Sequence, residues 1–218
     1  MEWATGIPGT VGGGVVNNAG AHGSSMAEAV SAVSVWTPQG ERQLQVDELG
    51  YGYRTSRFRS GGFEPPNLVL AARLAFRPGD PAAIEARIAE YAAYRRATQP
   101  NQSSVGSIFK NPPGDSAGRL LEQAGMKGTR RGGAEISPKH ANFIVNRGHA
   151  RAAEVLDLVS LAQERVMAAF GGTGGAGVLA PVKTLRVADS GSWLSCFQYS
   201  RYGPSPLHVL PRGLRRGP

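Results

Sequence analysis

The stretch Gly106-Ser-Ile-Phe-Lys-Asn-Pro112 is the segment around which we expect the rest of this chain to be arranged. Gly106 frees the backbone just before the hydroxyl of Ser107, and we expect the two apolar residues that follow to lie in a core. Lys110 and Asn111 then supply a positive charge and an amide before a proline ends the strand. A buried serine with a lysine three residues further on can donate a proton to a carbon centre while the cation binds an anionic substrate. Taken alone, the stretch also fits a strand end followed by a turn.

Composition predicts a globular protein with one large domain or two small ones. The chain has 218 residues, of which 41% are hydrophobic and 18% are charged. Of its net charge of +8, half lies in residues 184–218, which hold five Arg and one Asp. The remaining charge suits an enzyme that handles anionic ligands. Since no basic stripe is interleaved with aromatic residues, we expect no nucleic acid as a partner.

Cysteine, histidine and hydropathy patterns exclude several classes of site. The single cysteine, Cys196, excludes an intramolecular disulfide and a cysteine-based zinc site, and the four histidines lack ligand spacing. We therefore expect no metal. No apolar run is long enough to cross a bilayer, and Met1 leads straight into a glycine-rich turn with no visible signal peptide. We expect a cytoplasmic protein without a membrane partner.

A glycine-rich segment, residues 6–23, reads GIPGTVGGGVVNNAGAHG. Pro8-Gly9 indicates a tight turn, and the later glycines allow close backbone approach. We expect a loop whose N–H groups hold a pyrophosphate or the edge of a flavin ring, and a purely structural turn is the equal alternative. No G-x-G-x-x-G opens a helix after a strand, so a Rossmann domain is not indicated.

Periodicity predicts the remaining elements. Alternating valines across residues 27–46, with a turn at 38–40, predict a hairpin, and residues 68–76 predict a further strand. Helices are predicted over 81–96, over a short segment capped by Asp115 or Ser116, and over 151–170. The polar stretch 98–105 is the best internal linker. Arg54, between aromatic residues, is suited to binding a carboxylate, and a solvated loop arginine is the alternative.

Several blocks in register resemble the UDP-N-acetylenolpyruvoylglucosamine reductase (MurB) family of peptidoglycan precursor synthesis. The blocks are residues 6–13 with 18–23, Tyr53-Arg54-x-Ser-x-Phe58, residues 106–112, 116–125 and 133–146, and together they cover about residues 4–170. The short interval between Arg54 and Ser107 resembles the type II branch. The resemblance implies an α+β fold with a partial FAD-binding domain of the vanillyl-alcohol-oxidase/PCMH type (1–97) and a MurB C-terminal substrate-binding domain (98–183). The remaining residues, 184–218, are rich in Ser, Pro, Arg and Gly and show no periodicity, which predicts a poorly structured basic tail.

The resemblance also implies an activity and its residues. The family reduces UDP-N-acetylglucosamine enolpyruvate to UDP-N-acetylmuramate with FAD, which NADPH reduces, and we expect a monomer. Arg54 would stabilise the enolate and Ser107 would protonate the α-carbon. Tyr53, Lys110, Asn111 and Asn142 would bind substrate or the nicotinamide nucleotide. The residues implied to lie along FAD are Gly6, Ile7, Pro8, Gly9, Thr10, Gly12, Gly13, Asn18, Ala19, Gly20 and Gly23.

Two departures from the family pattern support an alternative. The family's first FAD-binding segment would precede Met1, and Pro181 stands where the family's catalytic Glu is expected. The glycine run before Pro181 and the aperiodic tail after it suggest a reading-frame change. The alternative is therefore a catalytically impaired fragment or pseudoenzyme that at most binds flavin or a UDP-sugar.

Overall fold

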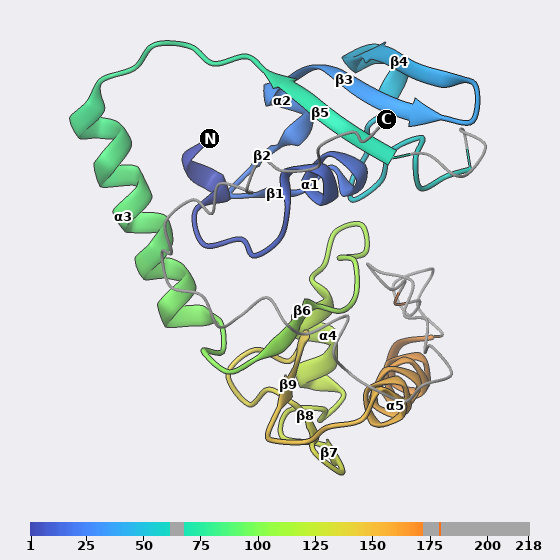
Figure 1. Ribbon diagram of the computed structural model, residues 1–218. Coiled ribbons are helices and arrows are strands. Elements are labelled where there is room, and N and C mark those ends of the chain that lie inside the picture. Colours follow the sequence, from blue (N-terminus) through green and yellow to red (C-terminus); the bar gives the residue numbers. More distant parts are fainter. Residues whose placement is uncertain (62–67, 172–178, 180–218) are drawn as a thin grey trace, which may run out of the picture.

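A computed structural model describes residues 1–61, 68–171 and 179 of the chain. Its elements form two groups, each with an antiparallel sheet, and the long helix α3 (Pro81–Thr98) runs between them (Figure 1). The predicted mixture of helices and antiparallel strands, an α+β fold, is confirmed. The predicted tail 184–218 and Pro181 lie outside the described residues.

The first group is built on a three-stranded sheet in the order β4-β3-β5. Strands β3 (Val30–Thr37) and β4 (Gly40–Gln45) form the predicted hairpin, and β5 (Leu68–Leu74) pairs with the other edge of β3. The Thr37 hydroxyl closes the turn by donating to the Gly40 carbonyl at 2.9 Å. The short elements of this group are η1 (Glu2–Ala4), α1 (Val11–Asn17), β1 (Gly20–Ala21), β2 (Ser24–Ser25), α2 (Met26–Ala29) and η2 (Val46–Leu49).

The expectation that residues 6–23 form a loop throughout was wrong, because α1 lies inside this segment. The Thr10 hydroxyl accepts a hydrogen bond from the Gly13 N–H at 3.0 Å and so caps the helix. Val15 on this helix is fully buried. Capping and burial together outweigh the poor helix propensity of three consecutive glycines.

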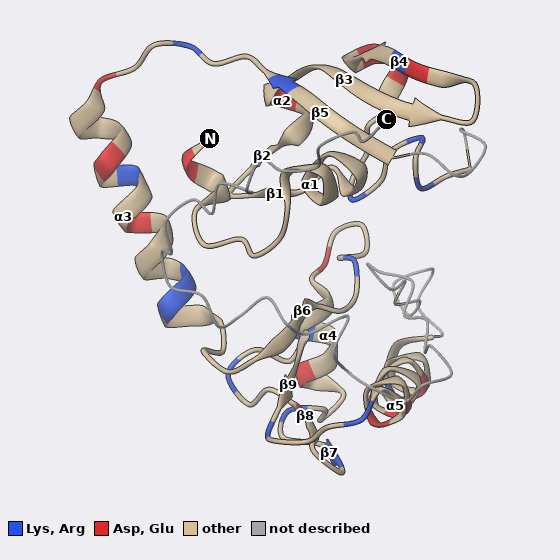
Figure 2. Cartoon of the chain, in the orientation of Figure 1, with Lys and Arg blue, Asp and Glu red and all other residues tan. Residues whose placement is uncertain are grey.

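Helix α3 begins at Pro81, as predicted, where the Asp80 carboxylate accepts from the N–H groups of Ala82 and Ala83. None of its residues is buried. Acidic and basic residues alternate along the helix (Figure 2). Its last turn carries two basic residues, Arg95 and Arg96.

The second group has a four-stranded sheet in the order β6-β9-β8-β7. Its strands are β6 (Ser104–Ser107), β7 (Arg130–Arg131), β8 (Ala134–Ile136) and β9 (Phe143–Asn146). The predicted helices are present as α4 (Ala117–Gln123), capped by Ser116, and α5 (Ala152–Phe170). The predicted α5 stripe is buried: Val155, Leu158, Val159, Ala162 and Val166.

The described residues form two hydrophobic clusters, one in each group. The first gathers around the β3 valines, with Trp3, Val15 and Leu49. The second lies among α4, α5 and their sheet, and includes Leu179, whose carbonyl accepts from Gln163 at 2.9 Å. In the described part of the chain, no helix is long and apolar enough to cross a membrane.

Candidate functional site

Ser107 ends β6, and its side chain is exposed, which corrects the expectation of a buried serine. Gly106 has a φ of +72°, and the pairing of β6 with β9 shifts register between Ser104 and Ser107. The backbone therefore twists here. The predicted burial of the next two residues is confirmed: Ile108 is 5% and Phe109 is 2% exposed. The serine hydroxyl thus faces solvent on a segment that the core holds in place.

Asn142 fixes this segment from the neighbouring strand end. Its side chain is 4% exposed and bonds to both backbone groups of Phe109. The Phe109 N–H donates to Asn142 Oδ1 and Asn142 Nδ2 donates to the Phe109 carbonyl, each at 2.9 Å. The Ile108 N–H adds a bond to the Asn142 carbonyl at 3.0 Å. The amide of Asn142 is therefore occupied by the chain itself, and it positions Ser107 and Lys110.

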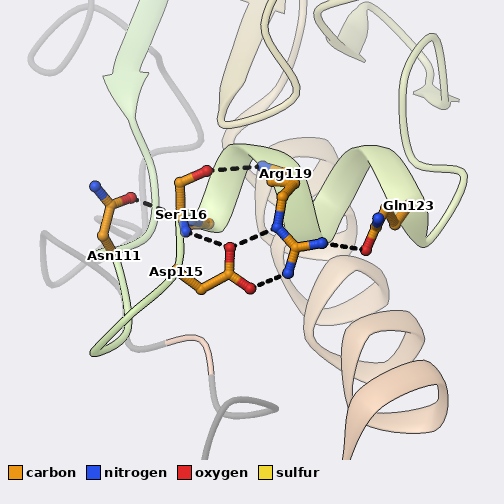
Figure 3. A network of polar contacts seen from close by, with 6 residues as sticks. Asn111, Asp115, Ser116, Arg119 and Gln123 are labelled. Atoms are coloured by element: carbon orange, nitrogen blue, oxygen red, sulfur yellow. Dashed lines mark hydrogen bonds and ion pairs between the residues drawn. The ribbon is translucent and has the colours of Figure 1, made fainter.

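Asn111 links the segment to the start of α4. Its Oδ1 accepts from the Ala117 N–H at 3.1 Å, and the Ser116 hydroxyl accepts from the Arg119 N–H at 3.2 Å (Figure 3). Arg119 donates to both carboxylate oxygens of Asp115 and to Gln123. The hydrogen bond from Arg119 holds the pKa of Asp115 below its usual range. This network fixes the loop that carries Asn111, while Lys110 beside it is half-buried.

Tyr53 and Asn111 meet although they are 58 residues apart in the chain. The Asn111 N–H donates to the Tyr53 hydroxyl at 3.4 Å. Arg54 lies with its guanidinium 5.9 Å from the Tyr53 ring centroid and donates to the Gly20 carbonyl at 2.5 Å. Among the described residues, no hydrogen bond or ion pair joins Arg54 to Ser107 directly.

The predicted cofactor residues divide into two kinds. Gly6, Pro8, Gly9, Thr10 and Gly23 are exposed, and a Cβ added at Gly9 or Gly23 would meet no other atom within 4 Å. These five residues are accessible to solvent.

The others support that surface. Asn18 is buried, donates to the Gly52 carbonyl and accepts from the Ala27 N–H, both at 2.9 Å. Gly20 has no room for a side chain, since a Cβ would lie 2.5 Å from the Ser24 carbonyl oxygen. The half-buried members of the set are Ile7, Gly12, Gly13, Ala19 and Gly20.

Arg95 was missed by the sequence reasoning. Its side chain lies against Gly6: a Cβ on that glycine would approach Arg95 Cδ to 3.2 Å. One turn earlier on α3, Tyr91 stacks on His22 with ring centroids 3.9 Å apart. The spacing of four residues between Tyr91 and Arg95 was the available signal, because it places both on one helix face.

Comparisons with known proteins find relatives over most of the chain. The family described as UDP-N-acetylenolpyruvoylglucosamine reductase, C-terminal domain, matches residues 99–173. A protein of Chloroflexus aggregans with the name UDP-N-acetylenolpyruvoylglucosamine reductase is 51% identical over 173 residues. Over 78% of its length the chain is similar to UDP-N-acetylenolpyruvoylglucosamine reductases. The predicted resemblance is thereby confirmed.

The match covers 78% of this chain but only 58% of the Chloroflexus protein. A second relative, UDP-N-acetylenolpyruvoylglucosamine reductase 2 of Symbiobacterium thermophilum, is 47% identical over 78% of this chain and 55% of its own length. The crystal structure of MurB from Thermus caldophilus superposes with a TM-score of 0.73 at 40% identity and covers 84% of this chain and 62% of that one. The chain therefore spans somewhat more than half of the relatives it matches.

Proposed function

We propose that the chain forms the substrate-binding domain and part of the flavin-binding domain of a UDP-N-acetylmuramate dehydrogenase. This enzyme reduces UDP-N-acetylglucosamine enolpyruvate to UDP-N-acetylmuramate, with NADPH as reductant, in peptidoglycan precursor synthesis. The names of the relatives support the reaction class. The observation that carries the proposal is the hydrogen bond between Asn111 and Tyr53, which joins the two segments expected to bind substrate.

FAD fits the surface of the glycine-rich segment. Residues 6 and 8–10 are exposed, and Gly9, with a φ of +137°, has open space where a side chain would stand. A planar ring edge or a pyrophosphate can lie against such a backbone without displacing a side chain. When bound there, FAD supplies the hydride that reduces the enolpyruvyl double bond.

The residues of the chain supply charge stabilisation and the proton. The Arg54 guanidinium stabilises the negative charge that moves onto the substrate carboxylate during reduction. The exposed hydroxyl of Ser107 then donates its proton to the α-carbon. Lys110 attracts the anionic substrate, and Tyr53 contributes its hydroxyl beside the same carboxylate. Asn142 acts indirectly, because its amide holds the Phe109 backbone.

We propose that residues 1–97 and 98–183 form two domains. All residues of the first hydrophobic cluster precede residue 98, and all residues of the second follow it. A nucleotide-linked substrate and NADPH are supplied in the cytoplasm, where we place the protein as a monomer.

The second candidate is an impaired fragment or pseudoenzyme that binds flavin or a UDP-sugar without turnover. Pro181 at the expected position of the catalytic Glu favours it, although this residue lies outside the described part of the chain. Both candidates bind flavin or a UDP-sugar, but only the reductase converts the enolpyruvyl substrate.

Visible absorption spectra of the purified chain with FAD, followed by NADPH oxidation with the enolpyruvyl substrate, test both candidates. The proposal predicts a bound-flavin spectrum that NADPH bleaches, and turnover that falls about 10²- to 10⁴-fold in Ser107→Ala with substrate affinity retained. Ser160→Ala, which removes an exposed hydroxyl from α5, is the matched control and should leave turnover unchanged. Flavin binding without turnover would favour the pseudoenzyme, and a colourless protein that ignores FAD would refute the flavoenzyme.

A further inference from the structure

The C-terminal half of α3 lies against the glycine-rich segment. The His22 ring stacks on Tyr91 at an interplanar angle of 10°, and Tyr94 meets the same ring edge-on at 5.5 Å. Helix α3 and strand β1 both contact η1, so the two elements share a neighbour. Arg95, on the same helix face as Tyr91, therefore reaches the surface assigned to ligands.

Within the described part of the chain, one hydrogen-bonding group of Arg95 has no partner. Its Nε is buried from solvent and meets no acceptor among the described residues. Its Nη1 donates to Gln99 Oε1 at 3.1 Å, which occupies one side of the guanidinium only. A buried N–H without an acceptor costs free energy, and such groups in proteins are normally satisfied by water or a ligand.

A second arginine, Arg54, contacts the same glycine-rich segment at the Gly20 carbonyl, as Arg95 does at Gly6. Burial lowers the pKa of Arg95, and the nearby charge of Arg54 lowers it further. Arg54 donates to the Gly20 carbonyl, and within residues 1–61, 68–171 and 179 neither arginine forms an ion pair with a carboxylate. Two neighbouring cations repel each other, and an anion between them removes that repulsion.

We infer that Arg95 and Arg54 together bind one oxyanion group of a ligand on the glycine-rich surface. The planar guanidinium presents its donors in a fork that matches a carboxylate or a phosphate. Gly6 makes the approach possible, because a Cβ there would lie 3.2 Å from Arg95 Cδ and 3.9 Å from its Nε. The inference rests on the proposed function for its ligands, which are FAD and the UDP-linked substrate.

Calorimetric titrations of the full chain with three probes test the inference. The probes are FAD, UDP-N-acetylglucosamine and its enolpyruvyl ether, and the variants are Arg95→Gln and the matched control Arg96→Gln. Arg96 carries the same charge on the next residue of α3 and is exposed. Loss of a charge-assisted hydrogen bond should weaken binding about 10- to 100-fold in Arg95→Gln. The control should bind within about twofold of wild type.

The pattern of losses identifies the oxyanion. Weakening for the enolpyruvyl ether alone assigns the substrate carboxylate, equal weakening for both UDP compounds assigns their pyrophosphate, and weakening for FAD alone assigns the flavin pyrophosphate. Unchanged binding of all three in Arg95→Gln, with wild type binding normally, would overturn the inference and leave the proposed function standing. A wild-type chain that binds none of the probes would overturn both.

Thermal unfolding controls for damage to the fold. Because Arg95 Nε has no partner in the described part of the chain, Arg95→Gln should unfold at the wild-type temperature or above it. Inorganic pyrophosphate should raise the unfolding temperature of wild type and Arg96→Gln more than that of Arg95→Gln. Equal shifts in all three proteins would contradict a two-arginine site. Arg95→Lys keeps the charge and should bind with intermediate affinity.

Discussion

Replacing Asn142 by alanine should destabilise the chain by about 2–6 kcal/mol. The side chain is 4% exposed and makes two hydrogen bonds of 2.9 Å, one to the N–H and one to the carbonyl of Phe109. Phe109 is itself 2% exposed, so water cannot replace the lost amide. Each buried backbone group left without a partner costs about 1–3 kcal/mol, and the two costs add because both groups are orphaned by one substitution.

Urea unfolding of the full chain, followed by circular dichroism, measures this loss. Asn101→Ala is the control, because Asn101 is exposed and should change the unfolding free energy by less than about 0.5 kcal/mol. A loss below about 1 kcal/mol in Asn142→Ala would refute the reasoning that this amide supports the segment. Substrate affinity lost without any loss of stability would instead make Asn142 a direct ligand.

Asn142→Asp refines the test, because the two halves of the amide have different roles. A carboxylate still accepts from the Phe109 N–H, but it faces the Phe109 carbonyl as a second acceptor. The variant should therefore be less stable than wild type at neutral pH. It should recover part of the loss under acid conditions, where the introduced carboxyl group is protonated and can donate to that carbonyl.

Three further predictions concern stability. Glu135 is 3% exposed, and hydrogen bonds from Arg147 and, to a smaller extent, Arg130 lower its pKa. The ionised carboxylate therefore stabilises the fold at pH values above the ordinary glutamate pKa. This stabilisation is lost as the pH falls through the lowered pKa of the folded state. Urea titrations across acid pH should show a steeper fall for wild type than for Glu135→Gln. Tyr51 has a buried hydroxyl without a partner among the described residues, and burial raises its pKa to about 12. Because the unfolded chain loses this proton at a pH of about 10, the wild type should lose stability as the pH rises from about 10 towards 12. Tyr51→Phe should be as stable as wild type or more so, and alkaline unfolding curves should lack this dependence. Ser116→Ala should cost about 1 kcal/mol in urea unfolding through loss of the α4 cap, and no change would contradict the capping geometry.

Local rules were enough to predict the larger elements. The hairpin followed from alternating valines around a glycine turn, and β3 and β4 pair as expected. The start of α3 followed from Pro81, and the buried stripe of α5 followed from its 3.6-residue period. In each case the pattern within the segment agrees with the tertiary packing, so the sequence signal is sufficient.

The failures have a common physical cause, which is contact with distant residues. Helix α1 forms in a glycine-rich segment because Val15 is buried, and burial is invisible to local propensity. Ser107 is exposed at a shift of register between β6 and β9, a pairing between distant segments. The hydrogen bonds of Asn142 to Phe109 join positions 33 residues apart, and no spacing rule predicts them. Arg95 was overlooked because its neighbours belong to another segment.

Backbone strain points to the same surface as the chemistry. Among the described residues, four non-glycine positions have positive φ, and three of them, Asn18, His22 and Arg54, lie on or beside the glycine-rich segment. Left-handed backbone costs about 1–2 kcal/mol for a residue with a Cβ. The buried hydrogen bonds of Asn18 and the ring stacking of His22 offset that cost within the chain. Arg54 has a φ of 54°, and replacing it by glycine would relieve this strain. The same replacement would remove the guanidinium that donates to the Gly20 carbonyl. If the site requires the positive charge of Arg54, an arginine is expected at this position even though its backbone conformation favours glycine.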